Sequence, residues 1–298
     1  MSRQIIPTIG ERGQAGPSPS IEIVEVGDLE RERSERLSNE SESYVRDTCA
    51  RLGLTPGTQV IEFGCGPCGA LPIFAGAVGP EGFVVGVDRD EGALEQARAN
   101  IVARGLCNNV HLVQADLNTV TPAEVCPLGL FDLAYCHVVL CYQTDVVAAL
   151  RRMAATVRPG GYIVAQEALF TAPIPVEAPG RFDRAANLLM NEWFPSLLGA
   201  MGACWDVAER YSMLCREANL VEVEQRVFAP SFLPAHARAG IAVYRDILVG
   251  VRPLLRRFDI ASEGKIDYVL RELDMALEEE RDSTIFTHIQ VELVARVS

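Results

Sequence analysis

Residues 60–69 of this chain read Val-Ile-Glu-Phe-Gly-Cys-Gly-Pro-Cys-Gly, so an apolar run with strand character passes directly into a glycine-rich turn. A helix is expected at 69–78. Pro72 is compatible with it, because proline is tolerated in a first helical turn. Glycines in such a turn let a ligand touch the bare main chain. This unit predicts a ligand site on a parallel α/β sheet. Gly64, Gly66 and Gly69 also satisfy Gly-x-Gly-x-x-Gly, which fits dinucleotide binding equally well.

The following residues repeat the alternation of short β-branched runs with helical periods, which is typical of a parallel sheet covered by helices on both faces. Asp90 and Thr144 are expected to cap the helices that follow the second and fourth strands. The Pro159-Gly160-Gly161 sequence is expected to end the second of these helices. Strands are predicted at 58–63, 82–88, 109–114, 131–136 and 162–166.

The alternation stops after the fifth strand, and helical spacing predicts inserted helices at 170–218. Asp206 with Glu209 is expected to begin one of them, and Asn219 to end it. Strands at 220–228 and 285–297 flank a second helical region. In that region Pro253 is expected to break or kink a helix. An apolar stripe along this helix is interpreted as core, and a subunit interface is the alternative. The stripe consists of Ile241, Tyr244, Leu248, Val251 and Leu255.

Composition argues against several classes of protein. The 298 residues carry a formal net charge of −13, which would repel a nucleic-acid backbone. No apolar run reaches the ~18 residues that a bilayer span needs. Of the 27 basic residues all but Lys265 are Arg. Phosphate-loop nucleotidases, pyridoxal Schiff-base enzymes and Tyr-x-x-x-Lys dehydrogenases need a lysine at a defined place, so the sequence excludes them.

The nine cysteines lack the spacing of a disulfide framework and favour a reducing, cytoplasmic location. Cys65 and Cys68 form one Cys-x-x-Cys, but no second pair follows, so no metal site is expected. Residues 1–20 lack the apolar core of a secretion signal and are expected to be a disordered tail. We expect residues 21–298 to form one domain, with helical segments at 21–56, 170–218 and 234–282 around the sheet.

Three acidic residues follow the first three predicted strands or lie within them. Asp88 ends the second strand, where a carboxylate can accept hydrogen bonds from both hydroxyls of a ribose. Asp116 follows the third strand and is placed to accept from an adenine amino group. Glu62 lies at the glycine-rich turn, where it would repel a pyrophosphate but attract the ammonium of an amino-acid tail. An amino-acid cation, a ribose and an adenine along one sheet edge indicate S-adenosylmethionine.

With these residues the sequence resembles the class I S-adenosylmethionine-dependent methyltransferases, in particular the small-molecule branch of the ubiquinone/menaquinone-biosynthesis type. Five ordered motifs carry the resemblance: Val-Ile-Glu-Phe-Gly-Cys-Gly-Pro (60–67), Val-Val-Gly-Val-Asp (84–88), Gln-Ala-Asp-Leu (114–117), Phe-Asp-Leu-Ala-Tyr-Cys-His (131–137) and Val-Arg-Pro-Gly-Gly (157–161). One departure is Cys68, where the family commonly has glycine, so the helix start is expected to be shifted or the turn tighter.

The resemblance implies a Rossmann-like sheet of seven strands with helices on both faces, a final antiparallel strand at 285–297 and a helical lid before the first strand. It also implies which residues bind the cofactor. Glu62, Gly64 and Gly66 surround the methionine part, Asp88 binds the ribose, and His137 lies near the methionine tail. The full cofactor set is Glu62, Gly64, Cys65, Gly66, Asp88, Arg89, Ala115, Asp116, Leu117 and His137.

Methyl transfer needs a base only when the acceptor must lose a proton. His137, Tyr135 and Glu167, at the ends of the fourth and fifth strands, are the candidate catalytic residues. Aromatic residues and methionine are dense in the insertion and suit a small apolar or aromatic acceptor, although the same residues would also fit a buried helical cap. The expected acceptor-binding residues are Tyr44, Met190, Trp193 and Phe194.

Three hypotheses remain from the sequence. The first is methyl transfer from S-adenosylmethionine to a small organic acceptor. The second is a fold relative that binds the cofactor without transferring methyl, such as a cyclase or a binding protein, which would have the same cofactor residues. The third, an NAD-dependent dehydrogenase, leaves Glu62 and Asp116 unexplained. For all three we expect a small-molecule substrate and no nucleic acid, and association through the N-terminal or C-terminal helices stays open.

Overall fold

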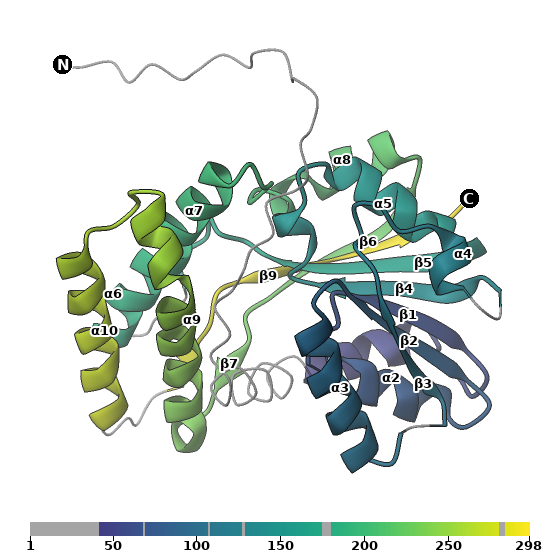
Figure 1. Cartoon of the computed structure of the whole chain (residues 1–298), viewed down its shortest axis with the longest axis horizontal. Helices are drawn as coiled ribbons and strands as arrows, with labels where there is room; N and C mark the ends of the chain where they lie inside the picture. Colours follow the sequence, from purple (N-terminus) through teal and green to yellow (C-terminus); the bar gives the residue numbers. More distant parts are fainter. Residues whose placement is uncertain (1–41, 68, 107, 127–128, 175–179, 280–283) are drawn as a thin grey trace.

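A computed structural model describes residues 42–67, 69–106, 108–126, 129–174, 180–279 and 284–298 (Figure 1). The expected tail at 1–20, most of the expected lid at 21–56 and Cys68 lie outside the described residues. Seven strands form one sheet in the order β3-β2-β1-β4-β5-β9-β6. Their bounds are β1 (Gln59–Phe63), β2 (Phe83–Asp88), β3 (Val110–Gln114), β4 (Phe131–His137), β5 (Val157–Ala168), β6 (Val221–Phe228) and β9 (Gln290–Arg296).

Strands β3, β2, β1, β4 and β5 are parallel, and β9 runs antiparallel to both β5 and β6. The predicted seven-stranded sheet with an antiparallel final strand is therefore confirmed. Because the parallel strands share one direction, Asp88 and the residues after β1, β3 and β4 meet at a single carboxyl edge.

Helices cover both faces of the sheet, as Figure 1 shows. On one face lie α2 (Leu71–Val78), α3 (Glu91–Ala103) and a helical segment at 42–51, packed on alternate strand residues such as Val60 and Leu133. On the other lie α4 (Pro122–Val125), α5 (Val146–Ala155) and α8 (Tyr211–Ala218), packed on residues such as Ile61 and Ala134. The period-two alternation of buried strand residues explains both layers.

Hydrogen bonds and ion pairs, partly buried, join the segment 42–51 to strands β9 and β6. Val45 and Cys49 pack into the core, and Thr48 donates to the carboxylate of Glu292 on β9 (2.5 Å). Arg51 pairs with Glu292 and with Glu224 of β6. Glu292 is buried, so the network brings a charge pair below the surface and fixes this helix against β9.

Of three predicted helix starts, one is confirmed and two are wrong. Asp90 caps α3 as predicted, accepting from the backbone N–H groups of residues 92 and 93 (2.8 and 3.2 Å). The expected cap Thr144 is wrong, because Asp145 accepts from the backbone of residue 148 (2.9 Å) and α5 begins one residue later. The expected start at Asp206 is also wrong, since Asp206 pairs with Arg210 (3.2 Å) and α8 begins only at Tyr211.

Two predicted ends also differ. Helix α5 ends at Ala155, before the Pro-Gly-Gly sequence, because residue 157 already pairs with Phe131 and β5 starts there. Of the break or kink predicted at Pro253, the break does not occur, since α9 (Ala237–Arg257) runs through the proline, and the kink stays a prediction. The apolar stripe continues into the buried Leu255 beyond the proline, and this burial offsets the one backbone hydrogen bond that proline removes. Asn219 ends α8 in the left-handed conformation (φ 60°), as predicted.

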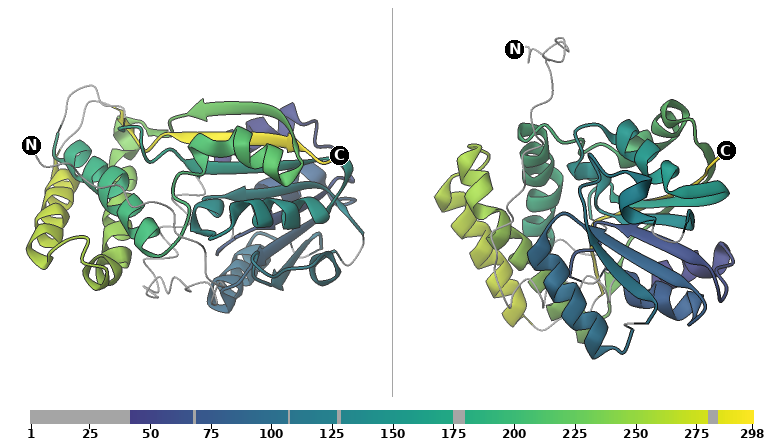
Figure 2. Two further views of the ribbon diagram at one scale, coloured as in Figure 1. Left: turned by 90° about the horizontal axis from the view of Figure 1, so that it is seen from above. Right: turned by 45° about the vertical axis from the view of Figure 1, so that its right-hand side comes forward.

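The inserted helices form a cap beyond the carboxyl ends of the parallel strands, as Figures 1 and 2 show. The cap contains α6 (Arg181–Asn187), a π-helical stretch (Leu188–Trp193), α7 (Phe194–Ala200), α9 and α10 (Glu263–Glu278). It has its own apolar cluster, which includes the whole α9 stripe, so the stripe is core as expected. The short strands β7 (Ser231–Phe232) and β8 (Ile285–Phe286) pair where the chain enters and leaves this region. Within the described ranges, no helix combines the length and apolar character that a bilayer crossing requires.

Candidate functional site

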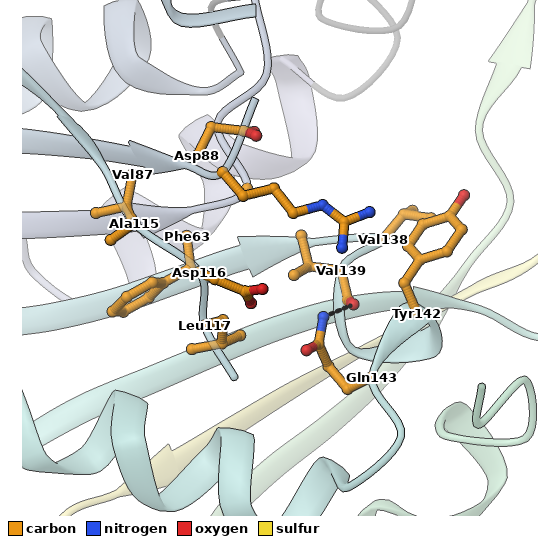
Figure 3. Close-up of a pocket in the computed structure, with 12 residues that line it drawn as sticks. Phe63, Val87, Asp88, Ala115, Asp116, Leu117, Val138, Val139, Tyr142 and Gln143 are labelled. Carbon is orange, nitrogen blue, oxygen red and sulfur yellow. Dashed lines mark hydrogen bonds between the residues drawn. The ribbon is translucent and has the colours of Figure 1, made fainter. Parts of the chain in front are cut away.

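A pocket opens at the carboxyl edge of β1, β2, β3 and β4 (Figure 3). Its volume is about 190 Å³, and it opens to solvent on one side. Six expected cofactor residues line it, and the other four, Glu62, Cys65, Gly66 and His137, are not among its lining residues. The lining residues are Phe63, Gly64, Val87, Asp88, Arg89, Ala115, Asp116, Leu117, Val138, Val139, Tyr142 and Gln143.

The glycine-rich turn is built on Glu62. This carboxylate is buried and accepts from the backbone N–H of Ala70 with both oxygens (2.9 and 3.1 Å). Gly69 lies above it with φ +48°, and a Cβ there would come within 2.3 Å of Glu62 Oε1. Burial raises the pKa of Glu62 to about 8, with a smaller contribution from the charge of Asp88. Glu62 therefore supports the turn from beneath the pocket.

The other two acids line the pocket directly. Asp88 accepts from the backbone N–H of Gly66 through Oδ2 (2.8 Å) and from that of Asp90 through Oδ1 (3.0 Å). Asp116 Oδ1 accepts from both the backbone and the side-chain amide of Asn118 (2.8 Å each). These bonds fix the orientation of each carboxylate, and Asp88 ties the end of β2 to the glycine-rich turn.

The segment after β4 supplies four lining residues that the sequence analysis did not single out. Val138 has φ 52°, a strained conformation for a β-branched residue, and brings Val139 against the turn. Gly64 has φ +69°, and a Cβ there would lie 2.3 Å from a methyl group of Val139, so only glycine fits. Tyr142 and Gln143 follow in the same segment. The sequence offered one signal for these four residues, which is that residues just after a parallel strand lie at the sheet edge where ligands bind.

Two candidate catalytic residues lie below this segment. Glu167 is buried, and its Oε1 accepts from the backbone N–H groups of Val139 (2.9 Å) and Leu140 (2.6 Å). Burial raises the pKa of Glu167 to about 7. Tyr135 is also buried, donates its hydroxyl to Gln166 Oε1 (2.8 Å), and has a pKa raised well above its usual value by that burial. In this structure both are bonded to the protein rather than facing the pocket.

The third candidate, His137, belongs to a polar cluster between the sheet and the cap. Its Nε2 donates to Gln290 Oε1 (3.0 Å), so the lone pair of the neutral ring is on Nδ1. Tyr244 of α9 accepts from the backbone N–H of His288 (2.9 Å), and its hydroxyl lies 3.3 Å from His288 Nδ1. Burial lowers the pKa of His137, and burial with the nearby His137 lowers that of His288 to about 4. Both rings are therefore neutral at pH 7.

Comparison with known proteins agrees with this geometry. The profile of a family described as "Methyltransferase domain" matches residues 54–212, more than half of the chain. The chain belongs to the class I S-adenosylmethionine-dependent methyltransferases. Its methyl donor is S-adenosylmethionine, and the match covers all five parallel strands, including the four at whose ends the pocket lies.

Named relatives of this methyltransferase act on different acceptors. A trans-aconitate 2-methyltransferase from Azoarcus sp. (strain BH72) is 26% identical over 203 residues, which cover 65% of this chain and 70% of the relative. The ubiquinone/menaquinone biosynthesis C-methyltransferase UbiE of Ectopseudomonas mendocina (strain ymp) is 32% identical over 126 residues, 42% of this chain and 47% of that enzyme. The chain thus spans only about half of the UbiE relative.

Among solved structures, YjhP from E. coli superposes with a TM-score of 0.54 at 14% identity, covering 93% of this chain and all of that one. At this identity the likeness shows the fold alone. It agrees with the seven-stranded sheet and its helical layers.

The residues of the methyltransferase pocket fit its cofactor. Gly64 leaves bare main chain where any side chain would strike Val139, and two carboxylates lie on separate strand ends, as a ribose and an adenine require. Leu117 and Ala115 add apolar surface to the pocket. When bound, the cofactor supplies a methyl group activated by a positive sulfonium.

The expected acceptor residues fall into two places. Met190, Trp193 and Phe194 are buried in the cap cluster of the methyltransferase. Of these, Phe194 makes an edge contact with the pocket residue Tyr142, with ring centroids 6.4 Å apart. Tyr44 lies elsewhere, stacked on Phe228 at the end of β6 with centroids 4.1 Å apart. The structure therefore joins the cap to the cofactor pocket through one aromatic pair and does not bring Tyr44 to it.

Proposed function

We propose that the protein transfers a methyl group from S-adenosylmethionine to a small acceptor that is largely apolar or aromatic. The contact of Phe194 with Tyr142 is the observation that carries this proposal, because it places the apolar cap directly against the cofactor pocket. Phe170 extends the aromatic surface, with its ring centroid 5.6 Å from that of Phe194. The name of the UbiE relative, a quinone-biosynthesis enzyme, supports an acceptor of this kind.

The protein's part in the reaction is mainly positioning. Alignment of two reactants and exclusion of water can supply roughly 7–11 kcal/mol of a barrier. The turn around Gly64 and the carboxylates of Asp88 and Asp116 are proposed to fix the cofactor. Met190 and Trp193, behind Phe194, are proposed to shape the apolar wall against which the acceptor lies.

A proton must leave when the acceptor is a phenol, an enol or an activated carbon acid. His137 is proposed to take it, because the ring is neutral, its Nδ1 carries the lone pair, and it directly precedes the pocket residues Val138 and Val139. Glu167 and Tyr135 are proposed to act as positioning residues, since the bonds described above commit both to the protein. Glu62 is proposed to hold the glycine-rich turn in place through its hydrogen bonds with Ala70, since its pKa of about 8 keeps it uncharged at pH 7 in the ligand-free protein.

The test is incubation with methyl-labelled S-adenosylmethionine and two matched sets of acceptors, one of quinols and phenols with alkyl chains, the other of dicarboxylic acids. Label is expected in the aromatic set. Phe194→Ala should raise KM for that set more than it lowers kcat, whereas Phe258→Ala, on the far end of α9, is the control and should change neither. Label confined to the dicarboxylic acids would contradict the proposed acceptor class.

A cyclase that uses the same cofactor without methyl transfer would give acceptor turnover without label. The family match does not favour it, and it does not favour the NAD-dependent dehydrogenase either.

A further inference from the structure

Gln143 has an unused hydrogen-bond acceptor in the cofactor pocket. Its side chain is only 7% exposed, and its Nε2 donates to the backbone oxygen of Val139 (2.9 Å). Its Oε1 is buried without a hydrogen-bond partner. A buried acceptor of this kind costs about 1–3 kcal/mol when it stays unpaired, so a ligand that supplies a donor would be favoured there.

The orientation of this amide is fixed by its surroundings. Rotating the amide by half a turn would place Oε1 against the oxygen of Val139, and two acceptors repel each other. The Nε2 bond to Val139 therefore directs Oε1 away from the post-β4 segment. Figure 3 shows this oxygen pointing toward the side of the pocket where Asp116 and Leu117 lie, with Tyr142 on the opposite side.

We propose that Gln143 reads the adenine base, accepting one N–H of its exocyclic amino group beside Asp116. An amino group has two N–H donors, and the pocket then offers two acceptors from different elements, one after β3 and one after β4. A base with an oxo group at that position would instead place its oxygen against both acceptors. Gln143 is in this way a specificity residue for the cofactor, and nothing in the five sequence motifs marks it.

The experiment uses two ligands that differ at this group and at the neighbouring N1, which is an acceptor in adenine and an N–H donor in hypoxanthine. Isothermal calorimetry measures the Kd of S-adenosylhomocysteine and of S-inosylhomocysteine, in which an oxo group replaces the amino group, for the wild type and for Gln143→Met. Methionine keeps the length of the side chain and removes the amide. We expect the variant to bind S-adenosylhomocysteine roughly three- to tenfold more weakly, the loss of one neutral hydrogen bond. Its Kd for S-inosylhomocysteine should stay the same or fall, because that ligand places an oxo oxygen and no amino donor against residue 143.

A purely structural role gives a different pattern. Removing Nε2 also removes the bond to Val139, and a general loosening of the pocket would weaken both ligands by the same factor. Equal losses for the two ligands, or no loss for S-adenosylhomocysteine, would overturn the proposal. Gln143→Leu serves as a second variant if the first does not fold. Gln114→Met is the matched control, since Gln114 donates to the backbone oxygen of Arg89 (3.2 Å) and does not line the pocket, and its discrimination between the ligands should equal that of the wild type.

Discussion

Replacing Glu62 by glutamine should make the stability of the ligand-free protein less sensitive to alkaline pH. The folded pKa of Glu62 is about 8, against 4.5 for an unperturbed glutamate, so between these values the folded protein holds a proton that the unfolded chain has released. The contribution of Glu62 to the free energy of unfolding has its full value below pH 4.5. It declines as pH rises and is lost once pH has passed through 8. At about 1.4 kcal/mol per pH unit, the loss totals about 5 kcal/mol. Glutamine can still accept from Ala70 but does not ionise.

The assay is urea unfolding of the wild type and Glu62→Gln without cofactor between pH 5.5 and 9. The difference between the unfolding free energies, variant minus wild type, should increase by about 3 kcal/mol from pH 5.5 to pH 8. Above pH 8 this difference should be constant. Glu167, which also has a raised pKa, is present in both proteins and cancels. Glu95→Gln, an exposed carboxylate on α3, is the control and should show no trend. A difference that is flat with pH would refute the reasoning, because it would mean that Glu62 ionises in the fold without cost.

Three further predictions concern single carboxylates. Asp88→Ala should weaken binding of S-adenosylhomocysteine at least roughly tenfold by calorimetry, the loss of one hydrogen bond to a charged acceptor, and an unchanged Kd would contradict the ribose assignment. Glu167→Ala should lower the free energy of unfolding by about 2–6 kcal/mol in urea, since two buried N–H groups lose their acceptor, and a loss below about 1 kcal/mol would show that they find another. Glu292→Ala leaves Arg51 without its buried partner and should cost about 3–5 kcal/mol and speed proteolysis within 42–51. Glu42→Ala, which removes an exposed ion pair, should cost no more than about 1 kcal/mol, and equal effects would refute the buried-pair argument.

Local patterns in the sequence determined the fold and half of the pocket. Strand and helix periods depend on neighbouring residues alone, so the five parallel strands and the Asp90 cap could be predicted. The positions of Asp88 and Asp116 followed because parallel strands end at one edge of a sheet. The prediction at Thr144 failed because two neighbouring cap signals, Thr144 and Asp145, competed. At Pro253 burial of the flanking stripe outweighed the local preference for a break, and the helix continues.

Tertiary structure alone decided what each polar side chain does. Glu62, Glu167 and Tyr135 are acids or phenols near strand ends, yet packing turned them beneath the pocket and paired them with the protein, which no local pattern encodes. Val139 reaches Gly64 from a segment 75 residues later in the chain, and Gln143 enters the pocket only because its amide is held there. The sequence specifies which residues lie at the edge of the sheet, because backbone periodicity is local. Which of them can meet a ligand depends on long-range contacts and burial, and these exist only in the folded protein.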